Sequence, residues 1–418
     1  MKKILIILIT ALLAVLATFF GWYLFFRNPN IPAGEAIRNI LPFGSENDVQ
    51  LTTDNRQPTT GTSSQLTTAD EFSKPTADLF RISNTPIAGA VVFKRGGQTI
   101  VRYVDRATGH IYDVDLATLV KTKVANQTLP KIYEAYFRSD GNAVLLRSLK
   151  DDSDVVENLS LVLTPSQATL VSTSSPQATD ALYGVSSIAL RGDISAIAIG
   201  SGNILFYALR DTSSVVSSAF NGTGRRTLLA SPFTDWRLAA TGNSLVLYTK
   251  ASASAPGYAY TLNSSSGALT KILGPLNGLA VIPNTSGNRV LYSYVENGRA
   301  RSFAKNLQRN TLSEILPTTL AEKCVWSIKD AGILFCGAPT DDPGAGEPDN
   351  WYRGLTHFSD RVWFFDTNTD IAQVLVEPKQ SLGIDIDVVE PRLSPDENYL
   401  IFINKTDLSL WALKLERF

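Results

Sequence analysis

The residues best suited to binding lie in one long insertion, 337–358, with the sequence GAPTDDPGAGEPDNWYRGLTHF. Exposed Trp, Tyr and Arg side chains are favoured anchors at binding surfaces, and aromatic rings also stack on sugars. The alternative is that Trp351 and Tyr352 fold back onto the domain and cap it, because long loops need a small core of their own. We predict a recognition surface made by Asp341, Asp342, Asp349, Trp351, Tyr352, Arg353 and His357.

Metal binding finds little support in the sequence. Asp366, Asn368, Asp370 and Glu377 have the spacing of a calcium loop, but Ile371 stands where that loop needs Gly for its sharp turn. A turn between strands explains this segment better, and the acidic stretch 341–349 is a second calcium candidate, through its Asp side chains and backbone carbonyls. The whole chain contains 2 His and 2 Cys, which argues against a His/Cys metal cluster. We therefore predict no metal and no cofactor.

The two cysteines form a separate candidate feature. Cys324 and Cys336 lie symmetrically about a tight turn centred on Asp330. Two antiparallel strands joined by that turn would place the cysteines opposite each other on one face. Outside the cytoplasm such a pair can oxidise, so we predict a disulfide, the alternative being two buried thiols.

Familiar catalytic motifs are missing. The chain contains no G-x-S-x-G elbow, P-loop or dinucleotide-binding glycine pattern after a strand. Asp385, Asp387 and Glu390 could line a glycosidase-like pocket, but they lie in a connection between expected strands, IDIDVVEP, and we expect them to be solvated. The basic pair Arg225–Arg226 is too small for nucleic acid. We therefore predict a protein that is not an enzyme and binds no nucleic acid.

The elements that must position these residues are short strands. From Leu79 onward, runs rich in Val, Ile, Leu, Tyr and Phe alternate with Gly, Asn, Asp and Ser turns. A strand–turn–strand unit recurs at intervals typical of a four-stranded propeller blade. Aligned on the turn, the repeats are anchored near Gly97, Gly141, Ile194, Gly242, Gly287, Asp330 and Glu397. We predict an all-β, seven-bladed β-propeller over residues 78–418.

The two ends of that domain complement each other. The last repeat, Val388 to Leu413, contains only three strands, and residues 78–83 (DLFRIS) form a strand that begins no repeat. An open ring would leave two long edges prone to pairing with other chains. We expect residues 78–83 to pair with the strand 408–413 and so to complete the last blade.

These segments resemble the TolB-type, WD40-like propeller repeat, in which an apolar strand is followed by S-P-D-G or S-x-D-G and a second apolar strand. The segments 394–397 (SPDE) and 139–141 (SDG) come closest. Glu397 departs from the usual Gly, and the motif is degenerate in the third to sixth repeats. The resemblance implies a fold and no particular activity. The overall layout also resembles uncharacterised membrane-anchored proteins of candidate-phylum bacteria, which implies a bacterial cell surface.

The N-terminus predicts a membrane anchor. Lys2 and Lys3 precede an uncharged, largely apolar run at residues 4–26, which is long enough to cross a bilayer. A cleavable signal peptide is the alternative, but cleavage near Ala17 would leave an apolar stretch on the mature end. We predict a cytoplasmic tip and transmembrane anchor at 1–27, a flexible Pro/Ser/Thr-rich linker at 28–77, and a propeller outside the cytoplasm.

These features together predict a non-catalytic scaffold in the bacterial cell envelope. Its expected partner is another envelope protein or a component of a secretion apparatus. Binding of a polysaccharide or small ligand is the alternative, and an envelope hydrolase is a weaker one. A cavity on the ring axis with converging carboxylates would favour a ligand or hydrolysis, whereas a closed axis would favour a protein partner.

Overall fold

The computed structural model describes residues 78–125, 127–150, 153–165, 183–241 and 244–415. The predicted anchor and linker, residues 1–77, lie outside these described residues. Within the described part, no helix is both long and apolar enough to cross a membrane. The unit that contains the described residues, Asp70–Phe418, is treated by itself below.

The described residues confirm an all-β chain. Their strands pair in five four-stranded sheets and one seven-stranded sheet, all antiparallel. The first three sheets in chain order are β2–β5 (Ile87–Arg95, Gln98–Asp105, Ile111–Asp115, Lys121–Lys123), β6–β9 (Ile132–Phe137, Ala143–Leu149, Val156–Pro165, Tyr183–Leu190) and β10–β13 (Ile194–Ile199, Ile204–Leu209, Ser214–Ala219, Arg226–Ala230).

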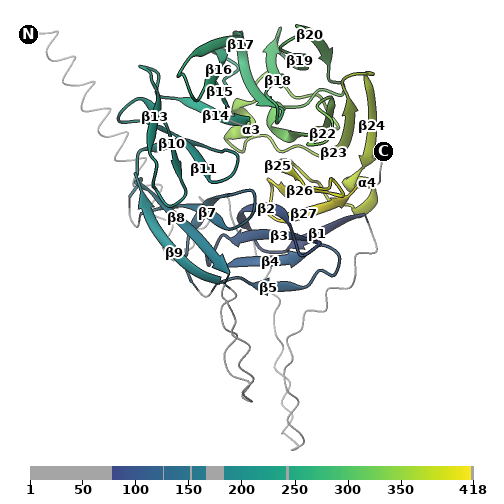
Figure 1. Ribbon diagram of the computed structural model, residues 1–418. Coiled ribbons are helices and arrows are strands. Elements are labelled where there is room, and N and C mark those ends of the chain that lie inside the picture. Colours follow the sequence, from purple (N-terminus) through teal and green to yellow (C-terminus); the bar gives the residue numbers. More distant parts are fainter. Residues whose placement is uncertain (1–77, 126, 151–152, 166–182, 242–243, 416–418) are drawn as a thin grey trace, which may run out of the picture. The chain divides into compact units, whose positions relative to one another are not determined.

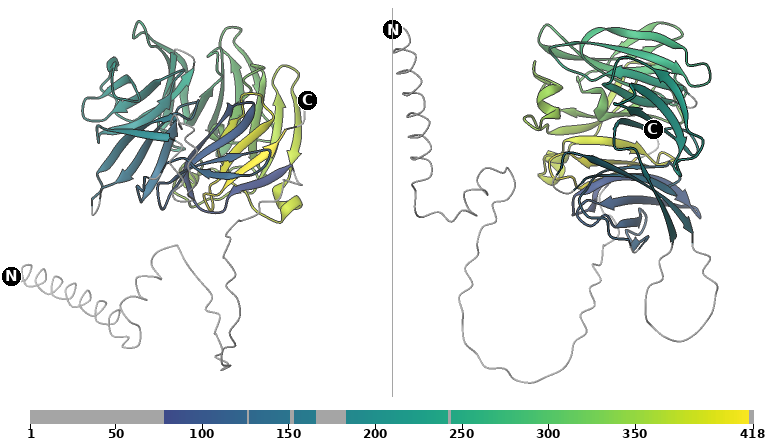
Figure 2. Two further views of the ribbon diagram at one scale, coloured as in Figure 1. Left: turned by 60° about the horizontal axis from the view of Figure 1, so that its bottom comes forward. Right: turned by 90° about the vertical axis from the view of Figure 1, so that its left-hand side faces the viewer.

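The remaining strands complete a ring of sheets around a central axis (Figures 1 and 2). The seven-stranded sheet contains β14–β20 (Trp236–Thr241, Ser244–Thr249, Pro256–Asn263, Leu269–Pro283, Arg289–Glu296, Arg299–Asn306, Thr311–Glu314). The others are β21–β24 (Cys324–Trp326, Ile333–Pro339, Asp360–Asp366, Ile371–Val376) and β25–β27 (Val388–Leu393, Tyr399–Asn404, Leu410–Lys414) joined by β1 (Leu79–Ser83). Two short helices, α3 (Asp349–Tyr352) and α4 (Pro378–Leu382), lie outside the sheets.

The strand β17 explains why one sheet has seven strands. It is 15 residues long, pairs with β16 through its first part and with β18 through its second, and Asn277 has a partner on both sides. Gly274 and Gly278 in the middle have positive φ angles of 103° and 67°. Because L side chains rarely adopt such angles, glycine lets the strand turn from one sheet into the next.

The ring closes through strands from the two ends of the described chain. β1 pairs with β27, with Leu79 opposite Leu413 and Arg81 opposite Trp411. The Arg81 guanidinium also lies 4.8 Å from the centre of the Trp411 ring. This is the pairing that the sequence analysis expects, and it completes a fourth strand for the sheet β25–β27.

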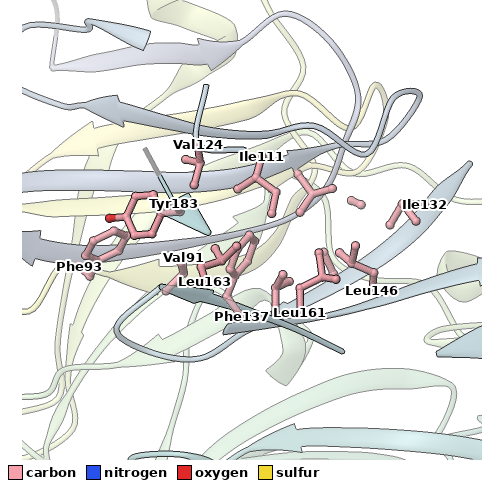
Figure 3. Packing of buried hydrophobic residues seen from close by; sticks show 14 of the residues in the cluster. Val91, Phe93, Ile111, Val124, Ile132, Phe137, Leu146, Leu161, Leu163 and Tyr183 are labelled. Atoms are coloured by element: carbon pink, nitrogen blue, oxygen red, sulfur yellow. The ribbon is translucent and has the colours of Figure 1, made fainter. Parts of the chain in front are cut away.

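Apolar clusters between neighbouring sheets hold the ring together. Figure 3 shows one of them, in which Phe93 of β2 lies beside Tyr183 of the next sheet and Val91 lies beside Phe137. The inner strands come so close that a Cβ atom at Gly89 would lie 2.1 Å from the carbonyl oxygen of Ala135. Glycine is therefore required where β2 passes β6.

The departure from the repeat motif at Glu397 has a physical reason. Its φ of 54° is one that glycine adopts more easily. The side chain reaches the neighbouring sheet, where Oε1 accepts hydrogen bonds from Ser327 Oγ (2.8 Å) and from the Lys329 backbone N–H (2.9 Å). The carboxylate thus joins the β25–β26 turn to the β21–β22 turn and offsets the backbone strain.

We expect Glu397→Ala to lower the free energy of unfolding by about 1–2 kcal/mol, because it keeps the strained backbone and removes the charge-assisted hydrogen bonds. Glu397→Gly should lose less, since glycine removes the strain as well as the contacts. Urea unfolding of both variants measures the difference. An alanine variant at least as stable as the glycine variant would contradict this explanation.

We also expect that deleting residues 78–83 opens the ring. The sheet β25–β27 then loses its fourth strand, and the edge of β27 is left unpaired. The melting transition should move to lower temperature and become less cooperative, as measured by calorimetry. Deleting residues 60–65 instead is the control, and an unchanged transition in the 78–83 deletion would refute the role of β1.

Candidate functional site: an axial cavity with two glutamates

The ring encloses a cavity of about 750 Å³ on its axis. If the strands of each sheet are lettered A to D outward from the axis, the walls are largely A strands and the residues beside them. The described lining residues that carry polar or charged side chains are Tyr136, Ser139, Ser201, Tyr248, Thr285, Glu322, Trp326, Trp351, Glu390 and Arg392. Apolar residues such as Leu238, Val281 and Val389 form most of the remaining wall. A cavity that combines apolar residues with polar and charged groups suits a small molecule.

Glu390 is held in the cavity wall by a distorted strand. The register of β25 against β26 shifts between Val389 and Arg392, and Glu390 has a positive φ of 49°. Bulges redirect side chains, and strained backbone of this kind concentrates at functional sites. Of its side-chain surface 46% is accessible, and Glu390 is one of the residues that line the cavity.

The electrostatic surroundings of Glu390 favour its protonated form. Burial among protein atoms raises its pKa, and nearby Glu134 raises it further, while Arg392 opposes the shift. The Arg392 guanidinium lies 3.5 Å from the Glu390 carboxylate. Glu134 in turn accepts a hydrogen bond of 3.1 Å from the Tyr136 hydroxyl. Glu390 is therefore a carboxyl group that can release or take up a proton closer to neutral pH than a glutamate free in water.

Glu322 is the second carboxyl group in the cavity. It lies in a 3₁₀ turn (Ala321–Lys323) directly before β21, and it accepts a hydrogen bond of 2.6 Å from the Tyr352 hydroxyl. Burial raises the pKa of Glu322, although Tyr352 and Arg237 oppose the shift. Burial and the Glu322 charge also raise the pKa of Tyr352 well above its usual value, so this hydroxyl stays protonated and keeps donating.

The long insertion crosses one end of the cavity instead of projecting as a separate surface. Helix α3 lies within the ring in Figure 1, and Trp351 is only 4% exposed. Asp349 accepts a hydrogen bond of 2.6 Å from the Ala253 backbone N–H, which fastens the insertion to a different sheet. The insertion thus folds back onto the ring, which is the alternative that the sequence analysis left open.

The other predicted binding residues are spread over this insertion. Asp341, Asp342, Arg353 and His357 are exposed, and Arg353 Nε donates to the Asp349 carbonyl at 3.3 Å. The structure brings Trp351 and Tyr352 to the cavity end, whereas Asp341 and Asp342 do not line the cavity. The recognition surface on the insertion therefore stays a prediction.

A buried charge cluster lies behind Trp351. The Lys323 ammonium group is fully buried and pairs with Asp387 and, at 2.7 Å, with Asp360. Trp351 Nε1 donates to Asp387 at 3.0 Å, and the Phe358 backbone N–H donates to it at 3.2 Å. The expectation that Asp387 is solvated is therefore wrong, because its carboxylate has a buried cation and two N–H donors.

The outcome for the neighbouring carboxylates is mixed. Asp385 is exposed, as expected, and accepts from the Ser359 hydroxyl at 2.7 Å. Glu390 is exposed as well, as expected, with 46% of its side-chain surface accessible, and it lines the axial cavity. A bulge that no local sequence pattern indicates turns its side chain inward. Of the three carboxylates that the sequence analysis considers for a pocket, Glu390 is thus the one that lines the axial cavity.

The cysteines and the calcium-like segment lie in strands and turns. Cys324 and Cys336 are directly opposed in β21 and β22, and a disulfide joins them. Asp366 ends β23, where its Oδ1 accepts from the Asn368 backbone N–H at 2.8 Å to form the turn into β24. In the described part of the chain, no three His, Cys, Asp or Glu residues gather as a metal site would require.

Comparison with known proteins places the fold. No family model and no curated protein matches the chain. Among solved structures it is similar to an oligogalacturonate lyase in complex with manganese, with a TM-score of 0.53 and 10% identity over 83% of this chain and 96% of that one. It is also similar to the oligogalacturonate lyase of Vibrio parahaemolyticus, with a TM-score of 0.52 and 9% identity over 81% of this chain and 94% of that one.

A weaker similarity, to TolB of Acinetobacter baumannii, has a TM-score of 0.41 and 10% identity over 78% of this chain and 79% of that one, and it supports no argument. At these identities the similarity shows the fold alone.

The comparisons contradict the predicted function. A non-catalytic scaffold was expected because familiar catalytic motifs are missing, yet both lyases with this fold are enzymes. The scaffold prediction is therefore wrong, although identities near 10% do not establish an activity for this chain. The prediction fails for a physical reason. A site on a ring axis is built from single residues on separate strands, so the lack of a contiguous catalytic motif does not argue against an enzyme.

We expect Asp360→Asn to remove a pH-dependent loss of stability. Burial raises the pKa of Asp360 to about 6, although Lys323 opposes the shift. A raised pKa means that the stabilising contribution is full below the unfolded value of about 4 and is lost as the pH rises through about 6. Relative to the variant, the wild type should lose on the order of 3 kcal/mol at most over this range.

Urea unfolding of both proteins at about pH 4 and about pH 7 measures this difference. Asp385→Asn is the matched control, because hydrogen bonds from Lys379 and Ser359 lower the pKa of that exposed carboxyl group. Its removal should therefore change the pH dependence in the opposite sense. Equal pH dependence in the wild type and Asp360→Asn would contradict the assignment.

Proposed function

We propose that the chain is an enzyme of the lyase type that cleaves a carbon–oxygen bond in the axial cavity by acid–base elimination. The observation that carries the proposal is the pair of cavity-lining carboxyl groups, Glu322 and Glu390, which both have raised pKa values. A catalytic acid or base works best when its pKa lies near the working pH. Carboxyl groups in a cavity whose pKa values are raised are therefore candidates for proton transfer.

The cavity supplies the parts that an elimination needs. In its ionised form, Glu390 removes a proton from a carbon next to a carbonyl or carboxyl group of the substrate. Arg392, the only Lys or Arg among the described residues that line the cavity, binds the oxygen on which negative charge develops. A carbon–carbon double bond forms, and the carbon–oxygen bond breaks.

Glu322 completes the proton balance. In its protonated form it gives a proton to the leaving oxygen, which departs as a hydroxyl group. The Tyr352 hydroxyl holds the carboxyl group in place from 2.6 Å. Trp326, Trp351, Tyr136 and Tyr248 add aromatic side chains to the wall that a substrate would contact.

We expect Glu390→Gln and Glu322→Gln each to reduce turnover by about 10²–10⁴-fold, because each removes a group that transfers a proton. The assay is the ultraviolet absorbance of the new double bond, measured with a panel of oligosaccharides that carry carboxyl or carbonyl groups. Glu377→Gln, at a surface ion pair with Arg361, is the control and should retain wild-type turnover.

The pH–rate profile gives an independent check. The rising and falling limbs of the profile should both lie above the ordinary glutamate pKa of about 4.3, because burial raises the pKa values of Glu322 and Glu390. Full turnover in Glu390→Gln or Glu322→Gln, or no product from any substrate of the panel with the wild type, would contradict the proposal.

We also propose the finer architecture. If β17 is divided between two blades, the sheets give a seven-bladed ring that β1 completes, with repeats of the TolB type. The two partners of Asn277 support this division. Residues 4–26 would anchor the ring in a membrane, with residues 28–77 as a tether and the ring outside the cytoplasm. The Cys324–Cys336 disulfide supports that compartment, because disulfides persist in oxidising environments.

A further inference from the structure

The insertion that crosses the axis is fastened to three different parts of the ring. Asp349 accepts from Ala253 in the turn between β15 and β16. Tyr352 donates to Glu322 in front of β21, and Trp351 Nε1 donates to Asp387 in front of β25. A mobile lid would have few buried contacts, whereas this segment has hydrogen bonds in three directions.

Packing and charge hold the centre of the insertion as well. Trp351 forms a small buried cluster with Leu320 and Phe358, against which Val389 also packs. The Lys323 ammonium group lies 5.1 Å from the centre of its ring, and that of Lys405 lies 5.3 Å away. Moving Trp351 away would expose a buried cation and two carboxylates, which is costly. The insertion is therefore a fixed wall of the cavity.

The opposite end of the cavity has a different character. Ser139, Ser201 and Thr285 line it, and each lies in a turn between strands A and B. All three are exposed. In an antiparallel sheet the A–B turns lie at the end away from the start of strand A, where Glu322 and α3 are found. The cavity thus has a wall at one end and exposed turns at the other.

We propose that the axial cavity is a blind pocket that substrates enter only from the A–B turn face. A polymer cannot pass through the ring, so the pocket takes a small molecule or the end of a chain and acts on its terminal residue. The restriction to chain ends rests on the proposed function. The single entrance rests on the geometry alone, and a cavity of about 750 Å³ suits a ligand of drug-like size.

Thiol labelling tests the entrance without requiring turnover. Ala239→Cys places a probe thiol on the half-buried cavity wall of β14. It is combined either with Thr285→Cys at the proposed entrance or with Leu355→Cys, where the native side chain is 70% exposed on the insertion. A branched polyethylene-glycol maleimide, too large for the cavity, first modifies the outer thiol. A small methanethiosulfonate reagent then modifies the Ala239→Cys thiol, and mass spectrometry follows its rate.

The polymer at position 285 should slow modification of the inner thiol by about tenfold or more, if every route to a pocket of this kind passes that end. The polymer at position 355 should leave the rate unchanged. Equal rates in the two conjugates, or slowing only by the polymer at 355, would overturn the single entrance. Melting curves of both conjugates check that the ring stays folded.

A second readout addresses the chain-end restriction. Oligosaccharides labelled at one end should release only terminal products, and products from internal cleavage would overturn the restriction. The two readouts separate the failures. If the glutamine variants of Glu322 and Glu390 retain activity while labelling still shows one entrance, the catalytic proposal fails and the blind pocket stands.

Discussion

The buried ammonium group of Lys323 is the interaction on which the cavity depends. A charge that is fully buried must be paired, since an unpaired ion in the interior costs several kcal/mol. Lys323 meets this need with Asp360 at the start of β23 and Asp387 just before β25, so it joins two neighbouring sheets near the axis. Asp387 also accepts from Trp351, which ties the wall of the cavity to the same cation.

That cluster is not fully compensated within itself. Oδ1 of Asp360 is buried and has no hydrogen-bond partner among the described residues. One lysine faces two carboxylates there, while the ammonium group of Lys405 lies 5.3 Å from the centre of the Trp351 ring. Burial lowers the pKa of Lys405, although Asp387 opposes the shift. A buried ion cluster adds little net stability compared with an apolar core. It contributes specificity instead, because its charged side chains can be paired in only one arrangement. Because Trp351 donates to Asp387, its side chain is held in a single position as well.

Strain at the axis follows a different rule from strain at the rim. Glu397 has an unfavourable backbone angle at a turn, and three donors of the next sheet compensate for it. Glu390 has a similar angle of 49° on the innermost strand, but among the described residues its carboxylate has one ion-pair partner, Arg392, at 3.5 Å. Backbone strain that is offset by hydrogen bonds can be explained by the stability of the fold. Backbone strain without such hydrogen bonds is more often found at functional sites. This contrast separates the two glutamates, which the sequence alone does not distinguish.

The sequence could predict the features that repeat. Turn residues end strand C in several sheets: Asp115, Asn263, Asn306 and Asp366 each accept from the backbone N–H two positions ahead. This periodic signal, with the alternating apolar strands, leads to the all-β ring and to the pairing of β1 with β27. The cavity has no such signal. Glu322 and Glu390 are 68 positions apart, and only closure of the ring brings both to one cavity.

The insertion shows why the rest could not be predicted. A segment with Trp, Tyr and Arg can form either an exposed binding surface or a buried cover over the ring. Which of the two forms depends on whether the ring offers buried hydrogen-bond partners to these side chains. Those partners, Asp387 and Glu322, lie outside the insertion. The sequence favours a solvated Asp387 and gives no signal for Glu322. A Trp N–H that finds a buried carboxylate gains more than one that finds water, because the carboxylate would otherwise lack a donor. The position of Trp351 is thus decided by the charge cluster, and with it which end of the ring axis can be open.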